Sequence, residues 1–217
     1  MVFCFEEMTI EDIQKEYSGI VSQNDILVLA KSVAGRVDLP KELKGKSDMI
    51  LRLAKFSLQK QITLLANIEA CIGEKVYDSV IVIDKGKILG VSDCINPDDK
   101  AIKGGNALRC YMTSMGRICV FVGGDICFPE LWSFAEGSRY IISLIDRHID
   151  SVIISSAKAL AVYLGKYVLI CGNTTKICIN PYGKIESIKN GRMTAFYLPM
   201  SLALGKKLGK RIQFVEE

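Results

Sequence analysis

The sequence predicts an α/β fold in which helices pack on mixed parallel and antiparallel sheets. Short apolar runs such as Ile26–Ala30 and Ile118–Val122 alternate with segments whose apolar residues recur at helical spacing. Runs this dense suit strands that are covered on both faces. Hairpin signals, such as the Asp-Lys-Gly-Lys sequence at 84–87, separate other runs and predict antiparallel neighbours as well.

The first half of the chain predicts strands interrupted by two helices. We expect strands at residues 1–8 (at a sheet edge), 26–30, 62–71, 76–84 and 87–91. One helix is expected over Thr9–Tyr17 with Thr9 as its cap, and another from the candidate N-cap Ser47 to Lys60. Residues 31–46 and 92–106 contain Gly, Pro and Asp and predict loops.

The second half centres on residues 116–144, GRICVFVGGDICFPELWSFAEGSRYIISL. This stretch predicts a buried strand, a tight turn at Gly123, Gly124 and Asp125, a short helix beginning at Pro129, and a second strand after Gly137. A strand-to-helix turn of this kind commonly presents a nucleophile. Here the apex of the turn carries none.

The remaining segments predict one more helix and several strands. We expect an extended return over 107–113, a helix with Ile153, Ala157 and Leu160 on one face that stops at Gly165, a strand at 167–171 and a hairpin over 177–188. Residues 198–217 show no firm pattern.

Length and charge limit the classes of function. A chain of 217 residues predicts a single domain, 1–217, with a core that needs no disulfides. The net charge of +4 comes from scattered basic residues, so we expect no nucleic-acid partner. No apolar run approaches the roughly 20 residues that span a bilayer, so we expect no membrane segment.

The cysteines predict a reduced, cytoplasmic protein. There are eight, none in a Cys-x-x-Cys pair, and several lie in apolar runs where a free thiol packs as a small hydrophobe. With one histidine, which we expect at the surface, and no metal-ligand spacing, we expect no metal site and no cofactor.

The segment FVGGDICFPELWSFAEGSRYIISL resembles the nucleophile segment of the carbon–nitrogen hydrolase (nitrilase) superfamily. In that family an apolar strand ends in Cys, followed by an aromatic residue, Asp, two residues and Phe-Pro-Glu. The resemblance places Asp125, Phe128, Pro129 and Glu130 on family positions and Gly123 on the nucleophilic cysteine.

The resemblance extends over about residues 24–188. DILVLAK is similar to the family's first motif strand, VYDSVIVIDKGKILG to its hairpin with Tyr-Asn-Ser and Asp-Gly-Lys, SAKALAVYLGKYVLICGN to its later helix and strand, and INPYGKI to its closing hairpin. It implies an α-β-β-α sandwich, with mixed sheets, that pairs its helices across a homodimer interface.

The family's Glu-Lys-Cys triad is missing at all three matched positions. The general-base Glu falls on Lys31, the Lys falls near Cys94, and the nucleophile falls on Gly123. Hydrolysis by this route needs a thiol, a carboxylate and an ammonium acting together. We therefore predict a carbon–nitrogen hydrolase-like protein that has lost catalysis and serves in small-molecule binding, regulation or assembly.

Two interpretations of the pocket remain open. The candidate pocket comprises Lys31, Cys94, Gly123, Gly124, Asp125, Cys127 and Glu130. In one interpretation, an active amidase-type or nitrilase-type hydrolase of non-peptide C–N bonds uses Cys94 as a displaced nucleophile with Lys31 and Asp125 as electrostatic partners. In the other, Cys94 and Cys127 are packing residues, Asp125 caps the following helix or bonds turn amides, and Glu130 faces solvent.

Overall fold

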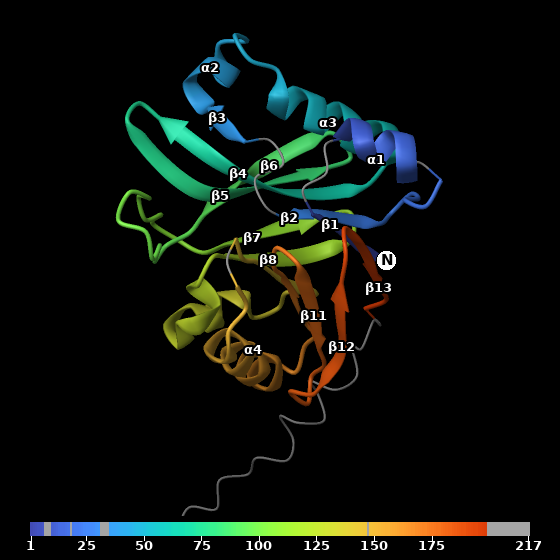
Figure 1. Cartoon of the computed structure of the whole chain (residues 1–217), viewed down its shortest axis with the longest axis vertical. Coiled ribbons are helices and arrows are strands. Elements are labelled where there is room, and N and C mark those ends of the chain that lie inside the picture. Colours follow the sequence, from blue (N-terminus) through green and yellow to red (C-terminus); the bar gives the residue numbers. More distant parts are fainter. Residues whose placement is uncertain (7–9, 18, 31–34, 147, 199–217) are drawn as a thin grey trace, which may run out of the picture.

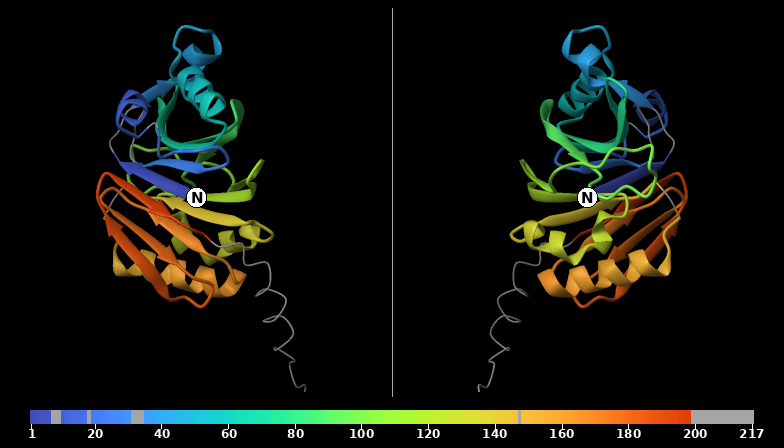
Figure 2. Two further views of the ribbon diagram at one scale, coloured as in Figure 1. Left: turned by 90° about the vertical axis from the view of Figure 1, so that its right-hand side faces the viewer. Right: turned by 90° about the vertical axis from the view of Figure 1, so that its left-hand side faces the viewer.

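Two β-sheets stack face to face, and helices cover the outer face of each sheet (Figures 1 and 2). The computed structural model describes residues 1–6, 10–17, 19–30, 35–146 and 148–198. The predicted α-β-β-α sandwich with mixed sheets is confirmed.

The first sheet has seven strands among the described residues, in the order β13-β1-β2-β4-β5-β6, with β3 paired to β4. The strands are β1 (Val2–Glu6), β2 (Ile26–Ala30), β3 (Arg36–Asp38), β4 (Thr63–Ile72), β5 (Lys75–Asp84), β6 (Lys87–Asp93) and β13 (Met193–Phe196). The prediction of an edge strand at residues 1–8 is wrong. β1 lies between β2, which is parallel to it, and β13, which comes from the far end of the chain and is antiparallel.

The second sheet runs in the order β12-β11-β10-β9-β8-β7. Its strands are β7 (Arg109–Thr113), β8 (Gly116–Val122), β9 (Tyr140–Leu144), β10 (Val168–Cys171), β11 (Thr175–Ile179) and β12 (Ile185–Asn190). The central strands β8, β9 and β10 are parallel, and hairpins add antiparallel strands at both sides.

Helices α1 (Ile10–Tyr17), α2 (Leu39–Leu43) and α3 (Met49–Lys60) lie on the side of the first sheet, and α4 (Ser151–Leu164) lies on that of the second (Figure 1). The turn after β8 continues into two 3₁₀ helices, η1 (Asp125–Cys127) and η2 (Pro129–Ala135); the short helix predicted to begin at Pro129 is the second of them. α4 stops at Gly165, which has the left-handed conformation predicted for it.

The prediction of an unstructured loop over residues 31–46 is wrong where the chain is described. β3 and α2 form there because β3 extends the ladder of β4 and the Asp38 carboxylate caps the Lys41 amide at 3.1 Å. Ser47 is not the cap of α3. The carboxylate of Glu42 instead accepts hydrogen bonds from the Met49 and Ile50 amides and from the Ser47 hydroxyl.

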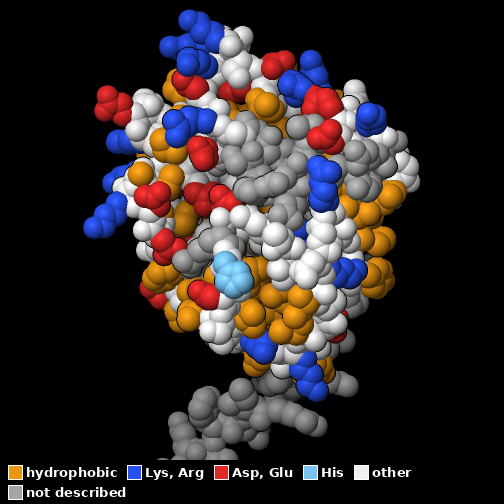
Figure 3. Space-filling model, in the orientation of Figure 1, with side chains coloured by type: hydrophobic (Ala, Val, Ile, Leu, Met, Phe, Trp, Pro, Cys, Tyr) orange, Lys and Arg blue, Asp and Glu red, His pale blue; other side chains and the backbone are white. Residues whose placement is uncertain are grey.

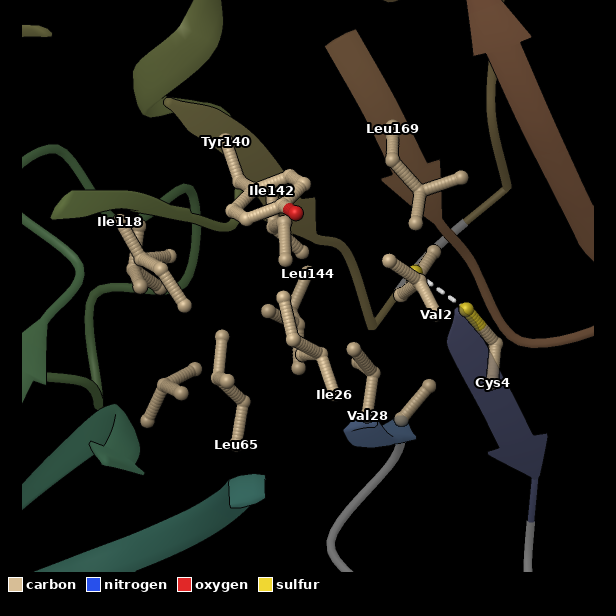
Figure 4. Packing of buried hydrophobic residues seen from close by; sticks show 14 of the residues in the cluster. Val2, Cys4, Ile26, Val28, Leu65, Ile118, Tyr140, Ile142, Leu144 and Leu169 are labelled. Atoms are coloured by element: carbon tan, nitrogen blue, oxygen red, sulfur yellow. Dashed lines mark hydrogen bonds between the residues drawn. The ribbon is translucent and has the colours of Figure 1, made fainter. Parts of the chain in front are cut away.

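The dense apolar runs are buried on both faces, as predicted. In β8, Ile118, Val120 and Val122 point into the core between the sheets, and Cys119 and Phe121 point toward α4 and the 3₁₀ helices. β2 divides its side chains between two cores in the same way. Figure 4 shows the core between the sheets, where side chains of β1, β2 and β4 meet those of β8, β9 and β10.

Candidate functional site

The turn at Gly123 lies where β8 ends, at the position that the family resemblance assigns to the nucleophile. Its amide donates to the Leu144 carbonyl at 2.8 Å, and its φ of +58° lies in the left-handed region that favours glycine. A Cβ on Gly123 would lie 2.9 Å from Cys94 Sγ and 3.6 Å from Asp78 Oδ2. The space in which a side chain at this turn would begin is therefore filled by the Cys94 thiol.

Cys94 follows β6 and is held by backbone hydrogen bonds. Its amide donates to the Asp78 carbonyl at 2.8 Å, and its carbonyl accepts from the Gly105 amide at 2.8 Å. Only 2% of the residue is exposed. Burial, and then the negative charges of Asp125 and Asp78, raise the pKa of the Cys94 thiol to about 12. Cys94 is thus a protonated, packed thiol at neutral pH.

Asp125 is fully buried and organises the loop after β6. Its Oδ2 accepts from the Ile95 amide at 2.8 Å, and its Oδ1 accepts from the Asn96 amide at 2.9 Å and the Asn96 side chain at 3.4 Å. Burial raises the pKa of Asp125, and these hydrogen bonds act in the opposite direction. The carboxylate therefore fixes the segment that carries Cys94 against the turn of Gly123.

A pocket of about 330 Å³ opens beside Gly123 and Cys94. The pocket lies between the two sheets' strand ends. Residues that follow β6, β8 and β9 form one side of it, and residues of β4 and β5 form the other. Its lining residues are Asn67, Glu69, Asp78, Cys94, Pro97, Asp98, Asp99, Ile102, Gly123, Gly124 and Asp146. Five of these eleven residues carry carboxylates, and this described lining includes no Lys, Arg or His. The lining is therefore acidic.

Asp78 on β5 contributes a carboxylate beside Gly123. Its Oδ1 accepts from Asn67 Nδ2 at 2.7 Å. Burial raises the pKa of Asp78 to about 6, opposed by the Asn67 hydrogen bond and reinforced by the charges of Asp146 and Asp125. Sequence reasoning did not select this residue. The available signal was Tyr77-Asp78-Ser79, where the family pattern has Tyr-Asn-Ser.

Comparison with protein-family models and with curated protein sequences finds no match. Solved structures do match. Nit3 of Saccharomyces cerevisiae, a member of branch 10 of the nitrilase superfamily, has a TM-score of 0.70 at 17% identity, over 96% of this chain and 86% of that one. A CN-hydrolase superfamily protein of Xanthomonas campestris with an arsenic adduct in its active site has a TM-score of 0.75 at 10% identity, over 97% and 94%. This chain has the fold of the nitrilase superfamily.

A third structure agrees with this assignment of the fold. The carbon–nitrogen hydrolase of Helicobacter pylori G27 has a TM-score of 0.67 at 14% identity, over 89% of this chain and 86% of that one. At these identities the comparisons establish the nitrilase fold.

The predicted site residues divide into three groups within the nitrilase fold. Cys94, Gly123 and Gly124 line the pocket, and Asp125 lies directly behind Cys94. Cys127 is half-buried in the core beneath α4, and Glu130 is exposed at the start of η2; neither is in the pocket lining. Lys31 lies outside the described residues.

His148 and Trp132, which the sequence also singled out, lie outside the pocket lining. His148 is exposed, and its pale-blue side chain is visible in Figure 3. Trp132 donates its indole N–H to the Ile126 carbonyl at 2.9 Å, and its ring lies 6.1 Å from that of Tyr163. The bond ties η2 to the turn that follows β8.

The described residues contain no cluster of three or more His, Cys, Asp or Glu side chains arranged to hold a metal ion. Within the same ranges, every helix falls short of the length and apolarity needed to cross a bilayer. What the described site offers chemically is a set of carboxylates, one amide and one protonated thiol.

Proposed function

We propose that this protein is a carbon–nitrogen hydrolase-like protein that has lost catalysis and acts by binding a small molecule in the acidic pocket, in a regulatory or assembly role. The observation that supports the proposal is at Gly123, the position that the family resemblance assigns to the nucleophile: a Cβ there would lie 2.9 Å from the Cys94 sulfur. Glycine supplies no nucleophilic side chain at this turn, and the Cys94 thiol lies where such a side chain would begin.

The chemical requirements of the reaction support this proposal. Attack on an amide or nitrile by the family's route needs a reactive thiolate, a base to receive the proton, and a cation to stabilise the oxyanion. Cys94, the described thiol of the pocket lining, has a pKa raised to about 12 by burial and neighbouring carboxylates. The carboxylates of the lining would oppose an oxyanion rather than stabilise it.

The same surroundings weigh against an active enzyme that uses Cys94 as a displaced nucleophile. That mechanism needs an accessible thiolate, whereas Cys94 is almost wholly buried beside two acidic side chains. It also needs Asp125 as a partner for catalysis, whereas both oxygens of Asp125 accept hydrogen bonds from the loop amides.

A turnover assay decides between the two functions. Wild type, Cys94→Ala and the control Cys127→Ala are incubated with a panel of amides, nitriles and ureido acids, and release of ammonia or amine is measured. We expect no turnover above the protein-free rate for any of the three. Turnover that is lost in Cys94→Ala and kept in Cys127→Ala would overturn the proposal.

The volume and the charge of the pocket indicate which small molecules to test as ligands. A volume of about 330 Å³ is at the lower end of the roughly 300–1,000 Å³ of small-molecule sites. Its acidic lining favours neutral or cationic molecules over carboxylates, because a carboxylate ligand would be desolvated among like charges. Binding raises the melting temperature, so a thermal-shift screen of matched amines, amides and carboxylates tests this preference.

We also propose a homodimer, on the basis of the family resemblance and the surface of α4. Val152, Val162 and Tyr163 on this helix are exposed, and Lys158 is its one charged residue. Hydrophobic side chains gather in the lower half of the face shown in Figure 3, where Figure 1 places α4. Light scattering of wild type and Val162→Lys tests the proposal: we expect a dimer that the substitution converts to monomer, and a monomeric wild type would refute it.

A further inference from the structure

Two cysteines face each other across the hairpin of β7 and β8. Cys110 and Cys119 are directly opposite in the antiparallel register of these two strands. Opposite residues of an antiparallel pair have Cα atoms about 4.5–5.5 Å apart. A disulfide spans about 4.4–6.8 Å between Cα atoms, so the backbone already has the required spacing.

The two thiols differ in exposure, as an attacking and a resolving cysteine do. Cys110 is half-buried on the outer strand β7, whereas Cys119 is fully buried in the core beneath α4. Cys110 is therefore the more accessible residue of the pair, and Cys119 is the inner one.

The surroundings of Cys110 favour its thiolate. Interaction with the Cys119 thiol, the hydrogen bond from the Ser138 hydroxyl at 3.6 Å and the nearby Arg117 guanidinium outweigh burial and lower the pKa of Cys110. The pKa of Cys119 is raised, because it keeps the proton that it shares with Cys110 and because it is buried. In its thiol form Cys110 donates to the Phe134 carbonyl of η2 at 3.2 Å.

Another thiol pair in the molecule provides a contrast. The sulfur atoms of Cys4 and Cys171 are 3.1 Å apart in the core between the sheets (Figure 4). Both residues are completely buried, and they belong to stacked sheets, whose backbones are usually about 10 Å apart. That pair lacks the access to solvent that Cys110 has, and its two residues lie on strands of different sheets rather than opposite each other in one ladder.

We propose that Cys110 and Cys119 form a redox site that hydroperoxides oxidise to an intramolecular disulfide. The Cys110 thiolate attacks one oxygen of the hydroperoxide, the O–O bond breaks, and the departing oxygen takes a proton to leave as water or an alcohol. The Cys119 sulfur then attacks the sulfenic sulfur of Cys110. The S–O bond breaks, and the hydroxide leaves as water with the Cys119 proton. Overall, two thiols lose two electrons and two protons to one hydroperoxide.

The reaction at Cys110 changes the hydrogen bonds of η2. The S–H group that the thiol form of Cys110 donates to the Phe134 carbonyl is lost when the thiolate forms and is absent from the disulfide, which leaves Arg117 Nη2 at 3.3 Å as a donor to that oxygen. Trp132, the one tryptophan of the chain, lies on this 3₁₀ helix. Its fluorescence therefore reports on η2 in both redox states.

The experiment is peroxide treatment of the reduced full-length protein, followed by alkylation, tryptic digestion and mass spectrometry. Trypsin cuts after Arg109 and Arg117, so Cys110 and Cys119 fall on separate peptides. We expect these peptides to become linked, with a mass lower by two hydrogens. We also expect iodoacetamide to alkylate Cys110 in the reduced protein at pH 7 at least about tenfold faster than the buried Cys178.

Matched variants identify which cysteine forms the disulfide with Cys110. The peptide of Cys119 also contains Cys127, so the link should persist in Cys127→Ala and disappear in Cys119→Ala, where dimedone should trap Cys110 as the sulfenic acid. Arg117→Gln should slow the oxidation several-fold through a higher Cys110 pKa. The proposal is overturned if wild type accumulates Cys110 sulfenic acid without a link, if Cys110 stays unmodified, or if the link survives in Cys119→Ala.

Discussion

The contact between Gly123 and Cys94 can be tested by adding a single methyl group. Gly123→Ala places a Cβ 2.9 Å from Cys94 Sγ in a backbone conformation with φ of +58°. Two separate costs arise. One is the strain of an L-residue in the left-handed region, and the other is the overlap with the sulfur. Comparison with a second glycine variant separates the backbone strain from the overlap with sulfur.

Gly73 is a matched control for the first cost. Its φ is +62°, and a Cβ there would meet nothing within 4 Å. Gly73→Ala should therefore lower the free energy of unfolding by the backbone strain alone, about 1–2 kcal/mol. Gly123→Ala carries the same strain plus overpacking of about 1–3 kcal/mol, because the Cys94 side chain is buried and its Sγ is directed at Asp125 Oδ1, 3.9 Å away. We expect a total of about 3 kcal/mol.

The second cost should vanish when the sulfur is removed. In the Cys94→Ala background, Gly123→Ala should cost only as much as Gly73→Ala does, which gives a coupling equal to the overpacking cost of about 1–3 kcal/mol in the double-mutant cycle. Urea unfolding followed by circular dichroism measures all four free energies, provided that the m-values stay constant. Equal costs for Gly123→Ala and Gly73→Ala in the wild-type background, or additive effects in the cycle, would refute the placement of Cys94 in the nucleophile's space.

Two further predictions concern the buried carboxylates. Asp125→Asn replaces an acceptor oxygen with an NH₂ group that faces the Ile95 or Asn96 amide. The free energy of unfolding, measured in urea, should therefore fall by about 2–3 kcal/mol. A decrease of less than about 0.5 kcal/mol would contradict the role of Asp125 in holding the loop. The pKa of Asp78 is raised from 3.8 to about 6 in the folded state, which therefore binds the proton more tightly than the unfolded state does. Stability should fall as pH rises from about 4 to 6, by up to about 3 kcal/mol. Asp78→Asn, which can still accept from Asn67, should remove this part of the pH dependence and stabilise the protein at pH 7; identical pH profiles for the two proteins would contradict the raised pKa.

Particular residues show why local patterns predicted most of the elements. The run Ile118–Val122 needs no partner to be recognised as a strand covered on both faces, because its side chains alternate between two cores. Gly165 ends α4 through its own backbone conformation, which is also a local property. The two errors at the start of the chain have a different origin. β1 is interior because β13 pairs with it, and β3 and α2 depend on the ladder of β4 and on Asp38.

In the candidate site, too, some residues were predicted from the sequence and others depend on tertiary packing. The family resemblance predicted Lys31, Cys94, Gly123 and Asp125 as neighbours, because the corresponding strand ends converge in that family. The last three lie close together, and Lys31 lies outside the described residues. The resemblance did not select Asp78 or Asn67, because their position beside the turn at Gly123 depends on how β5 and β4 lie against β8. Nor did it select the pair Cys110 and Cys119, which only the strand register brings together.

The sequence by itself determined the α/β layers, the sharp turn after β8 and the absence of a nucleophile at that turn, because periodicity, glycine placement and residue identity are properties of the chain. The tertiary structure decided that the Cys94 sulfur fills the vacated space, that Asp125 holds the loop, and that carboxylates line the pocket. These features depend on distances between residues far apart in the sequence, which only the packing of the two sheets establishes.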